Sequence, residues 1–406
     1  MIIIHNAKIF NGKKILEDNS ILVEKNIIKE IEKKITSKHC KDYLDAKKNF
    51  LMPGLIDAHF HVNTPNYNFY ESDRHPKSYI AAHAYNILVD TLNRGFTTIR
   101  DAGGGDQGIK MAIDQGIIDG PRFFYPGKAL TQTGGHGDMR KKEFIESCAC
   151  AYNGNITKVV DSSDEIRKHV REEFRKGANH IKIFLSGGVS TNLAPLEMAH
   201  FSDEEILTAV EEAERRNSYV MAHCHTDEGA NRCVDLGIRS IEHGSLIKAK
   251  TAKRIKKNNV YVVPTLSAGE LIAERAKDLG LEDETLQKVK EVNKLRNKAI
   301  EYCHKAGVKL GLGCDLHGRE YLKTQCRELL LRSQVQKPIE VLKSATSINA
   351  EIVQMENKLG VIKENALADV IIIKGNPLND LSIFMNSKEN LLFLMKDGLI
   401  KKRLLH

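Results

Sequence analysis

The sequence predicts an α/β fold in which a (β/α)8 TIM barrel carries a small β-sandwich domain built from both chain ends. Three observations lead to this prediction. Both ends of the chain alternate apolar and polar residues between turn signals. The middle alternates short apolar strands with amphipathic helices. The most unusual polar residues stand where several of these strands end. A chain of 406 residues is long enough for one large domain and a smaller companion.

The two ends of the chain are expected to pair with each other. Ile2-Ile3-Ile4 and Ser20-Ile21-Leu22-Val23 have the composition of strands, and the turn signal Asn11-Gly12 separates them. Segments 368–373 and 391–395 have the same character near the C-terminus. We therefore expect residues 1–53 and 360–406 to form a composite small β domain, and residues 54–359 to form the barrel.

The barrel prediction rests on eight candidate strands separated by helical stretches such as 204–216 and 285–306. The expected strands are 55–59, 97–101, 122–125, 180–185, 219–223, 240–243, 261–265 and 309–315. Periodicity alone also fits an open doubly wound sheet. The barrel is favoured because the chemically unusual residues end many different strands, and that end forms the catalytic face of a barrel.

The pair His59-Phe60-His61 ends the first expected strand. Alternation sends both imidazoles to the same face, where they could grip one divalent metal. Asp57 shares their parity and is expected to be their hydrogen-bond partner. Two polar strand residues without a metal are the alternative interpretation.

Four later strands each add one residue of a type that binds metals. Lys182 interrupts the apolar run Ile181-Lys182-Ile183-Phe184, and an unpaired ammonium there would be costly. Such a lysine could instead react with CO₂ to form an anionic carbamate that bridges two metals, or it could pair with a buried acid. The other strand-end residues are His223, His243 and Asp315. His225 shares the parity of His223, so either could reach a metal.

At this point the sequence resembles the amidohydrolase superfamily over essentially its whole length. The matching motifs are Pro-Gly-Leu-Ile-Asp-Ala-His-x-His at 53–61, Ile-Lys-Ile-x-x-Ser-Gly-Gly at 181–188, Ala-His-x-His at 222–225, Ile-Glu-His-Gly at 241–244 and Gly-x-Asp at 313–315. The loop 131–138, with sequence TQTGGHGD, is similar to the binuclear branch of Xaa-Pro dipeptidase (prolidase)-like and arginine carboxypeptidase-like enzymes. Cys314 departs from the Thr that often precedes the last aspartate in this family.

The resemblance implies two divalent ions, expected to be Zn²⁺, bridged by a CO₂-derived carbamate on Lys182 and by hydroxide. His59, His61 and Asp315 would hold one ion, and His223 and His243 the other. It also implies that Asp315 is the general base and that His136 donates a hydrogen bond to the substrate carbonyl, with Asp138 orienting His136. A His that only stabilises its turn is the alternative for His136.

The resemblance further implies a small-molecule substrate with an amide bond and a free carboxylate, such as a dipeptide or an N-acyl amino acid. By loop position, His225, Arg319 and Tyr70 are candidates to bind that carboxylate. Two other functions remain open. One is a mononuclear deaminase or cyclic-amide hydrolase resembling imidazolonepropionase, against which Lys182 argues. The other is a non-enzymatic relative with the same fold.

Composition excludes few classes of partner. Lys and Arg number 61 against 53 Asp and Glu, but these basic residues are scattered, so nucleic-acid binding is not expected. No run of about 18 apolar residues occurs, so no membrane span is expected. The eight cysteines form no disulfide-like framework, which favours a reduced, cytoplasmic setting. The resemblance further implies a homo-oligomer.

Overall fold

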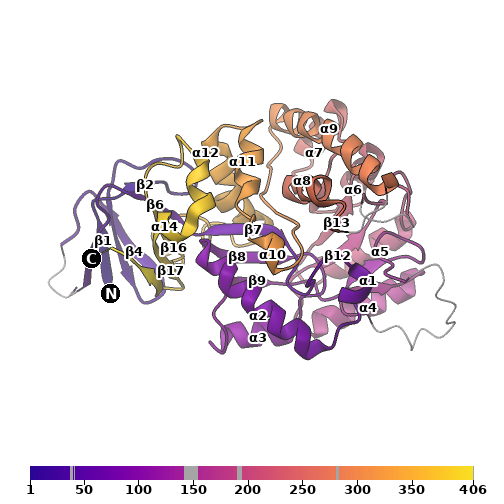
Figure 1. Ribbon diagram of the computed structural model, residues 1–406, viewed down its shortest axis with the longest axis horizontal. Coiled ribbons are helices and arrows are strands. Elements are labelled where there is room, and N and C mark those ends of the chain that lie inside the picture. The colour runs from indigo at the N-terminus through magenta and orange to yellow at the C-terminus, as the bar shows by residue number, and fades with distance from the viewer. Residues whose placement is uncertain (37–39, 41, 141–153, 190–193, 280–282, 406) are drawn as a thin grey trace.

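A computed structural model describes residues 1–36, 40, 42–140, 154–189, 194–279 and 283–405. The chain folds into two parts that lie side by side (Figure 1). The smaller part consists of sheets and carries both termini, and the larger part holds most of the helices. The structure is thus an α/β barrel with a β sandwich built from the two chain ends, as the sequence predicts.

The smaller part consists of two sheets. One has four strands in the order β4-β3-β1-β5, and the other has five strands in the order β18-β17-β16-β6-β2. In the second sheet, β16 pairs antiparallel with both β6 and β17, so the two chain ends share one hydrogen-bonded ladder. The strands are β1 (Ile2–His5), β2 (Lys8–Ile9), β3 (Ser20–Glu24), β4 (Ile27–Glu32), β5 (Asp42–Asp45), β6 (Phe50–Pro53), β16 (Val370–Ile373), β17 (Leu391–Lys396) and β18 (Leu399–Arg403).

The five-stranded sheet is buried on both faces. Ile372 and Phe393 pack towards the four-stranded sheet, with Ile4 and Ile21. Ile371, Ile373 and Leu394 point the other way, towards the barrel helices. Burial on both faces explains why segment 370–373 is continuously apolar and does not alternate. This second layer of packing fixes the sandwich against the barrel.

The barrel strands lie parallel to their neighbours in two sheets, of order β7-β8-β9 and β11-β10-β12-β13-β14-β15. Seven of the eight expected strands are present, and two short strands, β10 and β11, were not predicted. The barrel strands are β7 (Leu55–Phe60), β8 (Phe96–Asp101), β9 (Arg122–Phe124), β10 (Ala129–Thr131), β11 (Thr157–Val159), β12 (Ile181–Phe184), β13 (Val220–Cys224), β14 (Ser240–His243) and β15 (Tyr261–Val263).

Segment 309–315 closes the barrel but is not the regular strand that its sequence predicts. Its backbone bonds β15 through Gly311 N and Val262 O at 2.8 Å, and it bonds β7 through Ala58 N and Leu312 O at 2.8 Å. The side chain of Asn349 also inserts here, donating to Ile56 O at 2.6 Å and to Leu312 O at 2.8 Å. A side-chain amide thus replaces part of the backbone ladder, and for this reason the strand is irregular.

Helices surround the barrel, and those after β12 and β13 begin at capping residues. Ser202 caps α5 together with Glu205, and Thr226 caps α6 directly after His225, which fixes where β13 ends.

No helix in the described ranges is long and apolar enough to cross a membrane. The helices are α1 (Phe69–Ser72), α2 (Lys77–Asn93), α3 (Gln107–Asp114), α4 (Ser163–Arg175), α5 (Asp203–Glu214), α6 (Asp227–Asp235), α7 (Ala249–Lys257), α8 (Leu266–Arg275), α9 (Asp283–Ala306), α10 (Arg319–Leu322), α11 (Arg327–Ser333), α12 (Pro338–Lys343), the π-helix Ser344–Ile348, α13 (Asn349–Ile352), the 3₁₀-helix Leu381–Asn386 and α14 (Ser387–Asn390).

Candidate active site

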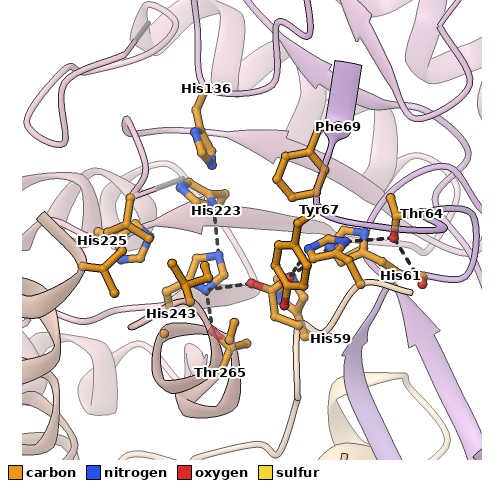
Figure 2. A pocket seen from close by; sticks show the side chains of 18 of the residues that line it. His59, His61, Thr64, Tyr67, Phe69, His136, His223, His225, His243 and Thr265 are labelled. Carbon is orange, nitrogen blue, oxygen red and sulfur yellow. Dashed lines mark hydrogen bonds and ion pairs between the residues drawn. The ribbon is translucent and has the colours of Figure 1, made fainter. Parts of the chain in front are cut away.

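A cavity of about 920 Å³ opens at the carboxyl ends of the barrel strands. This volume is within the usual range for small-molecule sites. Residues of β7, β8, β10, β12, β13, β14, β15 and segment 309–315, or of the loops that follow them, line it, and Figure 2 shows the imidazoles among them converging. The predicted site residues that line the cavity are His59, His61, Tyr70, His136, Lys182, His223, His225, His243 and Asp315.

The carboxylate of Asp315 faces both histidines of the first strand. Its Oδ1 atom lies 3.3 Å from His59 Nε2 and 3.1 Å from His61 Nε2. Burial alone would raise the pKa of Asp315, but the charge of His59 and hydrogen bonds from neighbouring imidazoles hold that pKa well below its usual range. The backbone of Asp315 has φ +53°, a left-handed conformation that ends strand geometry and turns the carboxylate to the site.

Three histidines form the other half of the site. His223 Nδ1 and His243 Nε2 face each other at 2.9 Å, and the ring of His225 stacks on that of His243 at 4.7 Å (Figure 2). The outer nitrogens have neutral partners. His243 Nδ1 lies 2.6 Å from Thr265 Oγ1, and His223 Nε2 donates to Gly187 O at 3.2 Å. His223, His225 and His243 form one group of possible ligand atoms, so both His223 and His225 are candidate ligands.

The donor set suits divalent metal ions. Three groups of ligand atoms each lie within 4.8 Å of one another: His223, His225 and His243; His59, His243 and Asp315; and His61, Asp315 and His317. Burial lowers the pKa of His61 to about 3 and that of His225 to about 4. Imidazoles held neutral in this way keep a lone pair free, as metal binding requires. The site therefore fits the ions that the sequence leads us to expect.

Lys182 lies on β12 inside the barrel and is 2% exposed. The expected alternative was a lysine paired with an acid. Among the described residues, no hydrogen bond or ion pair holds its ammonium, whose clearest neighbour is the ring of Phe184 at 5.4 Å. Burial lowers the pKa of Lys182 to about 8, against the opposing charges of Glu242 and Asp315. A fraction of neutral amine is therefore available near neutral pH.

Asp57 is a hydrogen-bond partner of His59, but through the backbone N–H and not through the imidazole ring. Its Oδ1 accepts from the backbone N–H of His59 at 3.0 Å, and Oδ2 accepts from Gln325 at 2.8 Å. The pairing of β7 with β8 shifts register between Asp57 and Phe60, so simple alternation does not hold along this strand. The partner of the His59 ring is instead Glu242, whose Oε2 lies 2.7 Å from His59 Nδ1.

His136 lines the cavity beside His223, with the two ring centres 4.5 Å apart (Figure 2). Gly188 lies against this ring, and a Cβ atom there would meet His136 Nε2 at 2.3 Å. Asp138 was expected to orient His136 but does not. It accepts from Gly134 N at 2.9 Å and from Arg140, because the tight turn directs its carboxylate back onto the loop. Burial lowers the pKa of His136 to about 3, which keeps it neutral.

The three candidates for carboxylate binding are placed differently. Tyr70 and His225 line the cavity. Arg319 does not line it, and its predicted role was wrong. Its Nε donates to Asp90 Oδ2 at 2.7 Å, because α10 packs against α2 and turns this arginine outward.

Sequence reasoning missed several residues of the site. Arg100 and Glu242 are charged residues within buried strands, and this is the same signal that identified Lys182. His317 follows Asp315 by two residues, stacks on His61 at 4.5 Å and lies 2.8 Å from Thr64 Oγ1 through its Nδ1. Arg296 comes from the middle of α9, where no local pattern distinguishes it from a surface arginine.

The chain is similar to known amidohydrolases over nearly its whole length. Residues 50–401 match the amidohydrolase family. Ochratoxinase of Aspergillus niger is 32% identical over 352 residues, which cover 83% of this chain and 73% of that protein. A solved prolidase in complex with N-methylphosphonate-L-proline is 36% identical, with a TM-score of 0.94 and 99% of each chain covered. A Xaa-Pro dipeptidase with bound methionine in its active site is 30% identical, with a TM-score of 0.86 and 99% of each chain covered.

These matches agree with the clustered histidines, the carboxylate between them and the barrel that presents them. The chain therefore belongs to the amidohydrolase family and is a metal-dependent hydrolase of carbon–nitrogen bonds in peptides or amides.

Proposed function

We propose that the chain hydrolyses dipeptides or N-acyl amino acids, in the manner of a Xaa-Pro dipeptidase, at a site with two zinc ions. The observation that carries the proposal is the convergence of His59, His61 and Asp315 with His223 and His243 at one cavity. The similarity to a prolidase bound to a proline phosphonate supports an amino-acid leaving group.

His59, His61 and Asp315 would hold one ion, and His223 and His243 the other. Bound divalent ions lower the pKa of water and polarise a carbonyl group. A carbamate on Lys182 would bridge the two groups of ligands. Burial and the lowered pKa of Lys182 support it, because only the neutral amine reacts with CO₂. The carbamate would also replace a buried cation without a partner by an anion among ligand side chains.

In the proposed reaction, the side chain of Asp315 transfers the proton and that of His136 donates a hydrogen bond. The carboxylate of Asp315 accepts a proton from the attacking water and delivers it to the nitrogen of the departing amine. Neutral His136 donates a ring N–H to the carbonyl oxygen as negative charge develops there. No described residue accepts from its buried Nδ1 atom, so the ring is not committed to another partner through that nitrogen.

A cation that lines the cavity would receive the free carboxylate of the substrate. The described lysines and arginines of the cavity wall are Arg140, Lys182 and Arg296. Lys182 is assigned to the metals, and Arg140 donates both Nε, at 2.8 Å, and Nη2, at 2.6 Å, to Asp138. Arg296 donates Nη1 to Leu266 O at 2.8 Å and pairs with Glu270, while no described residue accepts from its buried Nε. Arg296 is therefore our leading candidate, alongside His225 and Tyr70.

The test is a screen of dipeptides and N-acyl amino acids against zinc-loaded protein, with the released amine as the readout. We expect two ions per chain by elemental analysis, and loss of both activity and the second ion in Lys182→Ala. A single ion together with full activity of Lys182→Ala would contradict the two-metal site and favour a mononuclear deaminase or cyclic-amide hydrolase. Absence of both bound metal and hydrolysis would favour a non-enzymatic relative.

A further inference from the structure

The two groups of metal ligands differ in the partners of the ring nitrogens that would face away from the ions. A metal-binding histidine presents one ring nitrogen to the ion, and the partner of its other nitrogen sets the orientation and basicity of the ring. His59 has an ionised carboxylate in this position, from Glu242 at 2.7 Å. His243 Nδ1 has the neutral hydroxyl of Thr265 as its hydrogen-bond partner at 2.6 Å, with the carboxylate Oδ2 of Asp315 farther away at 3.9 Å, and His223 Nε2 has the neutral carbonyl of Gly187.

The buried carboxylate of Glu242 is held by hydrogen bonds from two side chains. Its Oε1 accepts from Arg100 Nη2 at 2.8 Å and from Ser240 Oγ at 2.7 Å, which leaves Oε2 for His59. Arg100 is fixed in turn by a bond from its Nε to Ala58 O at 2.6 Å. Arg100, Ser240 and Glu242 are all fully buried. The guanidinium of Arg100, 2.8 Å from Glu242 Oε1, is therefore the buried counter-ion of this carboxylate.

This arrangement determines which nitrogen of His59 faces the ligand cluster. An ionised carboxylate can only accept, so His59 must carry its proton on Nδ1 and offer the lone pair of Nε2. Nε2 is also the atom next to Asp315 Oδ1, at 3.3 Å. A hydroxyl such as that of Thr265 can donate or accept, so it imposes no such choice on His243.

We infer that the Arg100–Glu242 pair makes the ion held by His59 and His61 the more tightly bound of the two. Glu242 is thus a positioning residue that acts through His59, and the ion at His223 and His243 is the weaker one. The inference rests on the two-metal site proposed above. It predicts stepwise loading, in which the His59 position fills first.

The experiment is titration of metal-free full-length chain with Zn²⁺ in bicarbonate buffer, followed by calorimetry and chelator competition. Glu242→Gln keeps the shape of the side chain and removes its charge. We expect it to weaken the tighter binding step by about 10- to 100-fold, the usual effect of losing such a partner, and to leave the weaker step unchanged. The matched control Thr265→Val should weaken only the second step.

A folding failure would have to be separated from a binding effect, because Glu242→Gln leaves Arg100 buried without its counter-ion. The double variant Arg100→Met/Glu242→Gln removes both charges and should show the same selective loss. Equal weakening of both steps by either variant, or weakening of the second step alone, would overturn the inference. If the wild-type chain binds one ion only, the two-metal function fails. The role of Glu242 would be contradicted independently if the Glu242→Gln variant bound that single ion as tightly as the wild type does.

Discussion

Asp315 Oδ1 lies 3.1 Å from His61 Nε2, although the two residues stand at opposite ends of the barrel sequence. Segment 309–315 and β7 are neighbours because the barrel closes there, with Asp315 N bonded to His59 O at 3.0 Å. Closure of the barrel thus places the proposed base beside the first ligand pair, and this contact makes Asp315 the most informative residue to change.

Asp315→Asn should reduce kcat by about 10²- to 10⁴-fold, because the amide cannot accept the proton that general-base catalysis requires. Steady-state kinetics with elemental analysis of the same samples will check this. Retained activity with full metal content would show that another group carries the proton.

His136→Ala should lower kcat by about 10²- to 10³-fold with unchanged metal content, since it removes one donor to the developing oxyanion. Gly188→Ala should act in the same direction, because a Cβ atom would lie 2.3 Å from His136 Nε2 and displace the ring. An active Gly188→Ala variant combined with an inactive His136→Ala variant would show that the ring tolerates displacement.

Arg296→Gln should raise KM for substrates with a free carboxylate. A charge-assisted hydrogen bond contributes about 1.5–3 kcal/mol, which corresponds to roughly 10- to 100-fold. The same variant should act normally on substrates whose carboxylate is replaced by an amide. Arg319→Gln is the matched control, because that arginine pairs with Asp90 outside the cavity. An equal effect of Arg296→Gln on both substrate types would assign the carboxylate to another residue.

Glu328 should make stability depend on pH. This buried carboxylate accepts from Ser267 N at 2.7 Å and so holds the start of α8. Burial raises the pKa of Glu328 to about 7, against the opposing charge of Arg332. A raised carboxyl pKa favours the folded state below the unfolded pKa, near 4.5, and that contribution is lost as pH rises through about 7.

The free energy of unfolding of the wild type relative to Glu328→Gln should therefore fall by about 3 kcal/mol between pH 4.5 and pH 8. Denaturant unfolding of both proteins at several pH values measures the difference, and other titrating groups cancel between them. A difference that stays constant with pH would mean that the pKa of Glu328 is the same in the folded and unfolded states.

Local patterns in the sequence were sufficient for the elements that repeat a simple period. Seven barrel strands, helices α5 and α9 and the two halves of the sandwich follow from hydrophobic periodicity and turn signals. The same reasoning placed His59, His61, Lys182, His223, His243 and Asp315 at strand ends, and all six line one cavity.

Tertiary structure decided what periodicity cannot describe. Asn349, 34 positions beyond Asp315, interrupts the backbone ladder at 309–315. His243 has a left-handed backbone with φ +72°, so its ring faces the site even though strand alternation would send it away from the face of its neighbour Glu242. Glu242 replaced Asp57 as the partner of the His59 ring, and Arg319 pointed away to Asp90. The sequence by itself determined which residues reach the carboxyl face of the barrel, because strand alternation and burial are local. Only the tertiary structure decided their partners, because hydrogen bonds and charges join strands that are distant in the chain.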